Sequence, residues 1–279
     1  MILGAVFSAA YMQRALLAVI IVGVVAGVIG VHVNLRHQAF FADALTHTVF
    51  PGVAIAFAWQ QSLYVGAAIA GIVSAVVFAM LGRRARVSDD AALAVILTSF
   101  FAVGVVVVSR QHGYTGDLIS LLFGQVLTVR SSDVVTTAVI GGLALTVVAL
   151  AHRALVFSAF DPEGATAVGV SPWRLDMLLN IAVALVVVAS LRAVGTVLVI
   201  AMLITPAAIG RLLTNRVNSS IIVSVGAAVL AGVLGLVISY VGSVDHGVRL
   251  ATGATIAVVV TAMFGLASVA SAAKRSART

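Results

Sequence analysis

Apolar stretches, separated by short polar or charged segments, follow one another along the whole chain. They cover residues 15–34, 39–59, 62–82, 91–109, 132–151, 175–190, 193–213, 220–241 and 249–270. Because a helix needs about 20 residues to cross ~30 Å of hydrocarbon, nearly all of them are long enough to span a bilayer. The run over 175–190 is short, and only Leu191 and Arg192 separate it from the next run. The pattern therefore predicts an all-α, polytopic bundle of eight or nine transmembrane helices.

The composition supports a single transmembrane domain over residues 1–279. Hydrophobic residues make up 62% of the chain and charged residues 9%, and the mean hydropathy is +1.21. These values exclude an ordinary water-soluble domain, and the lipid bilayer is the expected surrounding. The net charge of +7 comes from small basic groups between the apolar runs, so it does not indicate a nucleic-acid partner. With no cysteine, the chain can form neither a disulfide nor a thiolate metal site.

Basic residues divide unequally between the two sides of the membrane if successive runs alternate in direction. The richer set consists of Arg36, Arg83, Arg84, Arg86, Arg153, Arg174, Arg211, Arg216, Lys274, Arg275 and Arg278. The poorer set consists of Arg14, Arg110, Arg130, Arg192 and Arg249. The positive-inside rule places the richer set in the cytoplasm. The C-terminus is then cytoplasmic, and the N-terminus lies outside if there are nine spans.

Two ionisable residues, Asp43 and His47, lie inside the apolar stretch FFADALTHTVFPGVAIAFAW that begins at Phe40. Residues four apart on a helix project from one face, about 6 Å apart along the axis, so both side chains can contact one ion. A carboxylate and an imidazole suit manganese, iron(II) or zinc, and leave positions open for other ligands. An intramembrane Asp costs roughly 2.5–3.5 kcal/mol and usually faces a cavity. The alternative to a metal site is that Asp43 is an acidic residue in the first turn of a helix, where the helix dipole favours it, and that His47 forms a hydrogen bond to another helix.

Two prolines lie inside predicted spans, Pro51 beside the ionisable pair and Pro206 in the seventh run. A proline has no amide hydrogen for the carbonyl four residues earlier, so a kink is expected at each. Kinked helices that face a central site commonly line a translocation pathway. The alternative is that each proline is only a tolerated kink.

The inner connection SAFDPEGATAVGVSPWR predicts a short cytosolic helix around residues 160–170. Asp161 is suited to the N-cap, Pro162 to the first helical position, Glu163 to the first turn and Gly169 to the end. The helix is expected to expose mostly small residues that would suit a groove on a partner, namely Ala165, Ala167, Val168 and Val170. The alternative is that this helix is only a connecting element of the bundle and docks no partner.

Two further polar or irregular regions are notable. The outer connection, residues 109–133, contains a short apolar piece that predicts an interfacial or re-entrant helix. Asp176 and Asn180 share one face near the start of the sixth run, where Asp176 is expected to cap the helix or to pair with Arg174.

Motifs for chemistry on a substrate are absent from the sequence. There is no G-x-x-x-x-G-K-[ST] phosphate loop, no G-x-S-x-G elbow and no H-E-x-x-H pair. The chain is therefore predicted not to be an enzyme. A polar pair in a kinked span and a capped cytosolic helix together indicate a pore that another protein drives.

Four stretches in register resemble the membrane permease of the metal-ion uptake family of ATP-binding-cassette importers. They are FFADALTHTVFPGVAIAF, DLISLLFGQVL, FDPEGATAVGV and VGTVLVIAMLITPAA, in the order found in that family. The resemblance implies that Asp43 and His47 hold the transported manganese, zinc or iron ion transiently, with no permanently bound cofactor. Phe41 and Ala42 stand where the family usually has a small residue and Gly, and Pro51 resembles the manganese branch.

The same resemblance implies the partners. Two permease copies form a homodimer. Cytoplasmic ATP-binding subunits hydrolyse ATP and bind the helix around 160–170, which is the coupling helix of the family. An extracytoplasmic receptor protein delivers the metal. The expected location is the bacterial cell membrane. Two other functions fit parts of the pattern. In a proton-coupled secondary transporter, Asp43 and His47 would relay protons, and in a non-transporting scaffold the cytosolic helix would recruit a partner.

Overall fold

The computed structural model describes residues 9–81, 88–109, 126–244 and 250–276. The helices are α2 (Ala10–Leu35), α3 (Ala39–Thr48), α4 (Phe50–Ala58), α5 (Leu63–Leu81), α6 (Asp89–Val108), α8 (Ser131–Phe160), α9 (Pro162–Ala167), α10 (Pro172–Val194), α11 (Thr196–Leu213), α12 (Val217–Val244) and α13 (Thr252–Ser276), with a 3-10 turn, η1, over Val126–Thr128. Within these described ranges, nine segments are long and apolar enough to cross a membrane, with α3 and α4 forming one of them. The predicted all-α bundle is confirmed, and the larger of the two expected span numbers holds.

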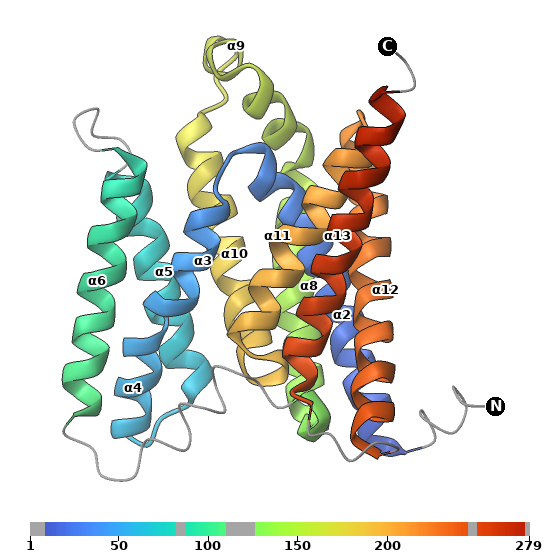
Figure 1. Cartoon of the computed structure of the whole chain (residues 1–279). Coiled ribbons are helices and arrows are strands. Elements are labelled where there is room, and N and C mark those ends of the chain that lie inside the picture. Colours follow the sequence, from blue (N-terminus) through green and yellow to red (C-terminus); the bar gives the residue numbers. More distant parts are fainter. Residues whose placement is uncertain (1–8, 82–87, 110–125, 245–249, 277–279) are drawn as a thin grey trace.

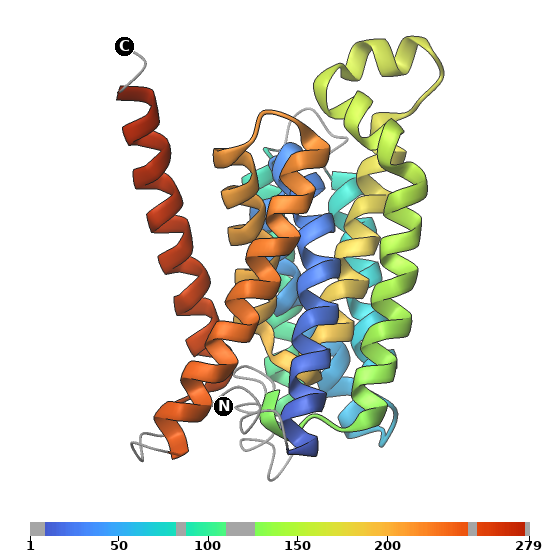
Figure 2. The same cartoon turned by 90° about the vertical axis from the view of Figure 1, so that its right-hand side faces the viewer.

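The helices run side by side along one axis, with α9 across one end (Figure 1). Helices α3 to α6 lie on one side and α2, α8 and α10 to α13 on the other, and the packing of α5 against α10 joins the two groups. Helix α13 contacts α11 and α12 and leans away from the remaining helices (Figure 2). Helix α2 begins at the end opposite to that where α13 ends, as an odd number of spans requires.

The boundary expected at Leu191 and Arg192 is wrong. Helix α10 continues to Val194, so the sixth span is not short, and only Gly195 separates α10 from α11. Gly195 has φ +82°, a backbone conformation that a residue without Cβ adopts readily. Leu191 and Val194 are both buried, and their burial favours continuing the helix to the residue before the glycine.

Helix α2 packs against α8, α10, α11 and α12 and forms the centre of the larger group. Glycines allow its close approach to α12: a Cβ at Gly27 would lie 2.9 Å from the Cα of Val225, and one at Gly23 would lie 3.4 Å from the amide nitrogen of Val229. Without a hydrophobic driving force between helices in lipid, such backbone approach supplies much of the packing energy.

The two long connections of the sequence differ in how much of them the structure describes. Helix α8 extends to Phe160 and carries the attached α9 beyond the ends of α10, α11 and α12 (Figure 1). The predicted interfacial or re-entrant helix lies mostly outside the described residues, which resume at Val126.

Candidate functional site

Asp43 and His47 both belong to α3, which begins close to the α9 end of the bundle. Both side chains are half-buried, whereas their helix neighbours Ala42, Ala44 and Leu45 are buried. Phe40, Asp43 and His47 are therefore a stripe of incompletely buried positions with helical spacing along one face of α3. The ionisable pair faces out of this chain rather than into its hydrophobic core.

The pair is a partial set of metal ligands. Among the described residues, no group of three or more His, Cys, Asp or Glu side chains is placed to hold a metal ion. A carboxylate and one imidazole leave at least two positions of a four- or six-coordinate ion to other donors. Those donors would have to come from water or from a second polypeptide chain, so the assignment of Asp43 and His47 as ligands stays a prediction.

The second span is interrupted beside the pair. Helix α3 ends at Thr48 and α4 begins at Phe50, so the break at Val49 lies two residues before Pro51. The break agrees with the loss of the hydrogen bond that a proline at position 51 cannot donate to the carbonyl of His47. In contrast, α11 continues through Pro206 without interruption. Whether either proline lines a pathway stays a prediction.

Helix α9 has the caps that the sequence predicts. The Asp161 carboxylate accepts a hydrogen bond from the amide of Gly164 (2.8 Å), and Pro162 is the first helical residue. The amide of Val170 donates to the carbonyl of Ala165 (2.9 Å), and Gly169 closes the turn with φ +83°. This last bond is the type that commonly ends a helix at a glycine.

The exposed face of α9 differs in part from the predicted one. Ala165 is fully buried and Val170 is half-buried, so both anchor the segment rather than face a partner. A six-residue helix lying on the bundle must bury one side, and Ala165 is on that side. Ala167 and Val168 are exposed, as expected, and Glu163 is exposed beside them.

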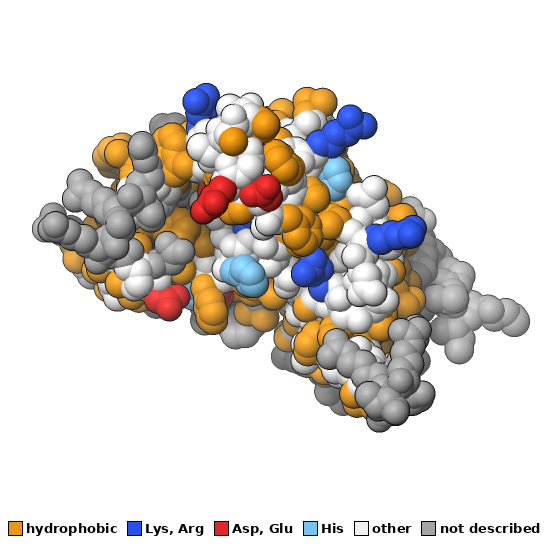
Figure 3. All heavy atoms as spheres, turned by 90° about the horizontal axis from the view of Figure 1, so that it is seen from above, with side chains coloured by type: hydrophobic (Ala, Val, Ile, Leu, Met, Phe, Trp, Pro, Cys, Tyr) orange, Lys and Arg blue, Asp and Glu red, His pale blue; other side chains and the backbone are white. Residues whose placement is uncertain are grey.

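The end of the molecule that carries α9 has a mixed surface (Figure 3). Acidic side chains lie among apolar ones, and basic side chains lie around them. Arg153, Arg174, Arg211 and Arg216, at or near the ends of α8, α10, α11 and α12, are all exposed. This distribution agrees with a cytoplasmic position for the α9 end.

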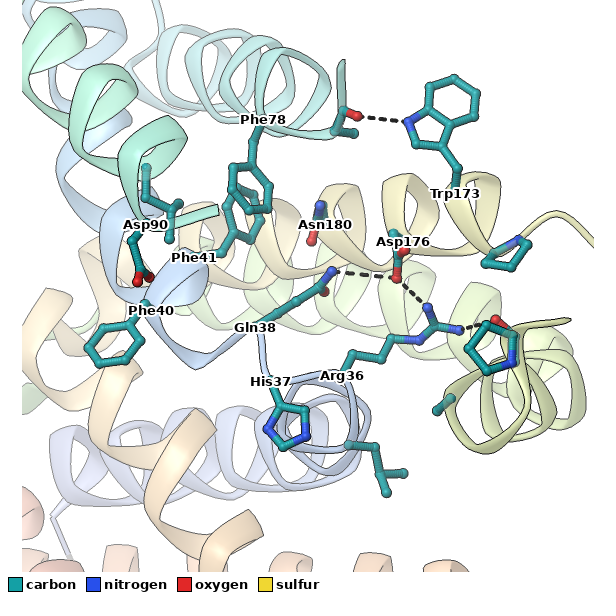
Figure 4. Close-up of a pocket in the computed structure, with 17 residues that line it drawn as sticks. Arg36, His37, Gln38, Phe40, Phe41, Phe78, Asp90, Trp173, Asp176 and Asn180 are labelled. Atoms are coloured by element: carbon teal, nitrogen blue, oxygen red, sulfur yellow. Dashed lines mark hydrogen bonds and ion pairs between the residues drawn. The ribbon is translucent and has the colours of Figure 1, made fainter. Parts of the chain in front are cut away.

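A pocket of about 590 Å³ opens beside α9 (Figure 4). It is lined by Leu35, Arg36, His37, Gln38, Phe40, Phe41, Phe78, Ala79, Asp90, Leu93, Ser158, Ala159, Pro162, Pro172, Trp173, Asp176 and Asn180. The expected capping role of Asp176, or its pairing with Arg174, is wrong, because its carboxylate pairs with Arg36. Sequence reasoning missed this pair because its members are 140 positions apart and no local pattern connects them.

The nine candidate spans of the described residues, with the capped helix at one end, are the architecture of a multi-pass membrane protein. A family model described as "ABC 3 transport family" matches residues 8–271. The chain belongs to this family and is the membrane permease subunit of an ATP-binding-cassette metal transporter. An ABC permease is a transport component.

Relatives and a solved structure agree with this class. The chain is 38% identical to the manganese transport system membrane protein MntC of Halalkalibacterium halodurans, over 93% of this chain and 87% of that protein. It is 35% identical to the chelated iron transport system membrane protein YfeD of Yersinia pestis, over 84% and 78% of the two chains. A chain of PsaBC from Streptococcus pneumoniae, solved in complex with Fab, superposes with a TM-score of 0.82 at 30% identity, covering 95% of this chain and 94% of that one.

Proposed function

We propose that this chain carries a divalent transition-metal ion into the cytoplasm through a site formed by Asp43 and His47. The observation that carries the proposal is the position of this pair on the outward stripe of α3, in a span most of whose residues are buried within the chain. Ionisable side chains facing lipid are costly, so a cavity or another protein surface is expected in front of them. A permeating ion needs ligands that bind it and then release it, and a carboxylate and an imidazole are ligand types that exchange with water and with other donors.

Manganese is the first candidate for the transported ion. The oxygen and nitrogen donors of Asp43 and His47 suit manganese, and the chain has no thiolate to favour softer metals. Relatives named for manganese transport share 37–38% identity over more than nine tenths of this chain, which supports the choice. Iron and zinc are the alternatives, since the same ligand types accept both.

A second copy of this chain is the proposed source of the missing ligands. A twofold axis in front of α3 would place two carboxylates and two imidazoles around one ion. The arrangement would also cover the half-buried stripe that one chain leaves open. Closed twofold symmetry is the commonest form of assembly, and every contact across it occurs twice.

The proposed partners act at the two ends of the bundle. ATP-binding subunits dock at α9 in the cytoplasm, hydrolyse ATP there and change which side of the metal site is open. A receptor delivers the metal at the opposite end, and the complex is expected in the cell membrane of a bacterium. The exposed Ala167 and Val168 suit an apolar groove on the ATP-binding subunit.

Ala167→Asp is expected to reduce the amount of ATP-binding subunit that copurifies with the permease by about tenfold, since a charge buried in the docking groove would be unpaired. The permease itself should fold normally, because Ala167 is exposed. Ala167→Ser, which keeps the side chain small, is the matched control and should copurify as wild type does. Equal copurification of the Asp variant would place the docking surface elsewhere.

The proposed function is tested by metal uptake in a bacterial strain that lacks its own importer. The strain is supplied with this chain, its receptor and its ATPase, and the uptake of manganese, zinc and iron is compared. Uptake that requires an intact ATP-binding subunit supports the importer. Transport by this chain alone that stops when the proton gradient is collapsed would identify a proton-coupled carrier. No uptake of any metal, with partner recruitment intact, would identify a scaffold.

A further inference from the structure

Arg36 joins three helices at the α9 end of the bundle. Its guanidinium pairs with the carboxylate of Asp176 on α10, and it donates hydrogen bonds to the carbonyl of Leu155 (3.2 Å) and the hydroxyl of Ser158 (3.0 Å) on α8. Only 6% of the Arg36 side chain is exposed. Since hydrogen bonds of a charged guanidinium are strong and directional, the end of α2, the end of α8 and the start of α10 are held together as one unit.

This unit is directly connected to α9. Ser158 lies three residues before Asp161, which caps α9, and no loop separates α8 from the cap. A displacement of α9 therefore acts on the last turn of α8 and, through Ser158 and Leu155, on Arg36.

The same unit is connected to the helix that carries the metal pair. Gln38 immediately precedes α3, and its Nε2 donates to the Asp176 carboxylate (3.4 Å). Asp43 follows five residues later in the same helix. The position of α3 along its axis is therefore tied to Asp176 through the Gln38 side chain.

Asn180 lies one helical turn after Asp176 on α10, and its side-chain amide could both accept a hydrogen bond from Gln38 and donate one to it. Asn180 is only 1% exposed, and neither its Oδ1 nor its Nδ2 has a hydrogen-bond partner among the described residues. The Oε1 of Gln38 is buried without a partner in the same part of the chain. Gln38, Asp176 and Asn180 all line the pocket in Figure 4. The two unsatisfied amides are complementary, because each has one donor group and one acceptor.

We propose that Gln38 exchanges Asp176 for Asn180 as the transporter changes state, so that α9 shifts α3 and its metal ligands by about one helical turn. The inference rests on the proposed function, because it assigns a role in coupling to residues between the ATPase docking helix and the metal pair. Asn180 is then a positioning residue. Its amide has no partner among the described residues in the present state because Gln38 reaches it only in the other state.

The decisive variant is Asn180→Leu, studied in the complete transporter reconstituted in liposomes. Leu has the same number of side-chain non-hydrogen atoms as Asn and the same branching, and it removes a buried polar group that has no partner among the described residues, so thermal stability should be unchanged or higher. Manganese uptake should nevertheless fall by about tenfold, within the usual range of coupling between sites, while basal ATP hydrolysis persists. If Asn180 had only a structural role, uptake would fall only together with thermal stability.

Ser74→Ala is the matched control. Ser74, on α5, is also 1% exposed and its hydroxyl also has no hydrogen-bond partner in the described part of the chain, but it does not line the pocket. This variant should import manganese at the wild-type rate. Wild-type uptake by Asn180→Leu, or an equal loss in both variants, would overturn the proposal.

A cargo-independent readout separates this proposal from the proposed function. Because the chain has no cysteine, Phe40→Cys introduces a single thiol on α3, at a position that is 74% exposed. Trapping ATP on the partner subunit should change the labelling rate of this thiol in the Phe40→Cys protein, but not when Asn180→Leu is added. An equal nucleotide response with and without Asn180→Leu would overturn the exchange at Gln38. A wild-type chain that imports no metal would instead overturn the proposed function.

Discussion

Asp43→Ala and His47→Ala are each expected to lower metal uptake by at least about 100-fold, since loss even of a group that only supports a metal ligand costs 10- to 100-fold. In the proposed dimer each substitution would remove two of four ligands at once. Asp43→Ala would also remove the negative charge that offsets the charge of the ion in a low-dielectric setting. The effect should fall on transport rather than on folding, because both side chains are half-buried and project from the outward stripe of α3.

Uptake of manganese, zinc and iron by these variants is compared with the amount of permease in the membrane and with copurification of the ATP-binding subunit. Asp90→Asn is the control for loss of a carboxylate, because Asp90 is exposed at the start of α6 and lies outside the proposed ligand set. It should transport as wild type does. If both alanine variants assemble normally and still import metal, the pair is a packing feature and the permeation site lies elsewhere.

The second large effect is expected at the contact between α4 and α5, where Gly52→Ala or Gly66→Ala should destabilise the permease by about 1–3 kcal/mol or more. A Cβ at Gly52 would overlap the carbonyl oxygen of Gly66, and a Cβ at Gly66 would overlap that of Gly52. Both obstacles are backbone atoms, so no rotamer change relieves the clash and the helices must separate. Because Gly52 follows Pro51, the separation would also disturb the break beside His47.

Thermal unfolding in detergent, followed by the loss of monodisperse protein, measures this effect. Gly142→Ala on α8 is the matched control, because a Cβ there would meet no atom of the described residues within 4 Å. It should keep or raise the stability, since alanine is the better helix former by about 0.8–1.0 kcal/mol. Unchanged unfolding temperatures for Gly52→Ala and Gly66→Ala would show that α4 and α5 do not pack as closely as described.

Local features of the sequence predicted most of the architecture. Hydrophobic runs indicated the spans because the hydrocarbon thickness sets the length of each helix. The capped helix α9 was predicted from Asp161, Pro162 and Gly169, since each acts on backbone groups within a few residues. The end of α10 was missed, because an arginine interrupts the apolar run before the helix stops at Gly195.

The candidate metal pair was predicted because Asp43 and His47 are one helical turn apart, a relation that the sequence contains by itself. The direction in which the two side chains point was not predicted. Only the packing of α3 shows that the residues beside them in the helix are buried, whereas Asp43 and His47 face outward. Similarly, the packing of the bundle put Ala165 on the buried side of α9.

By itself, the sequence determined that this chain is an all-helical membrane bundle of eight or nine spans, which residues cap the short helix α9 and which ionisable residues share a turn, because those properties depend on composition and spacing along a helix. Only the tertiary structure decided that the chain has nine spans and that Arg36 pairs with Asp176. It also showed that the Asn180 amide near Gln38 has no partner among the described residues, and that two glycines bring α4 and α5 together. These contacts join residues far apart in the chain, and the physical reason is that packing, which depends on all the helices at once, selects which polar groups meet.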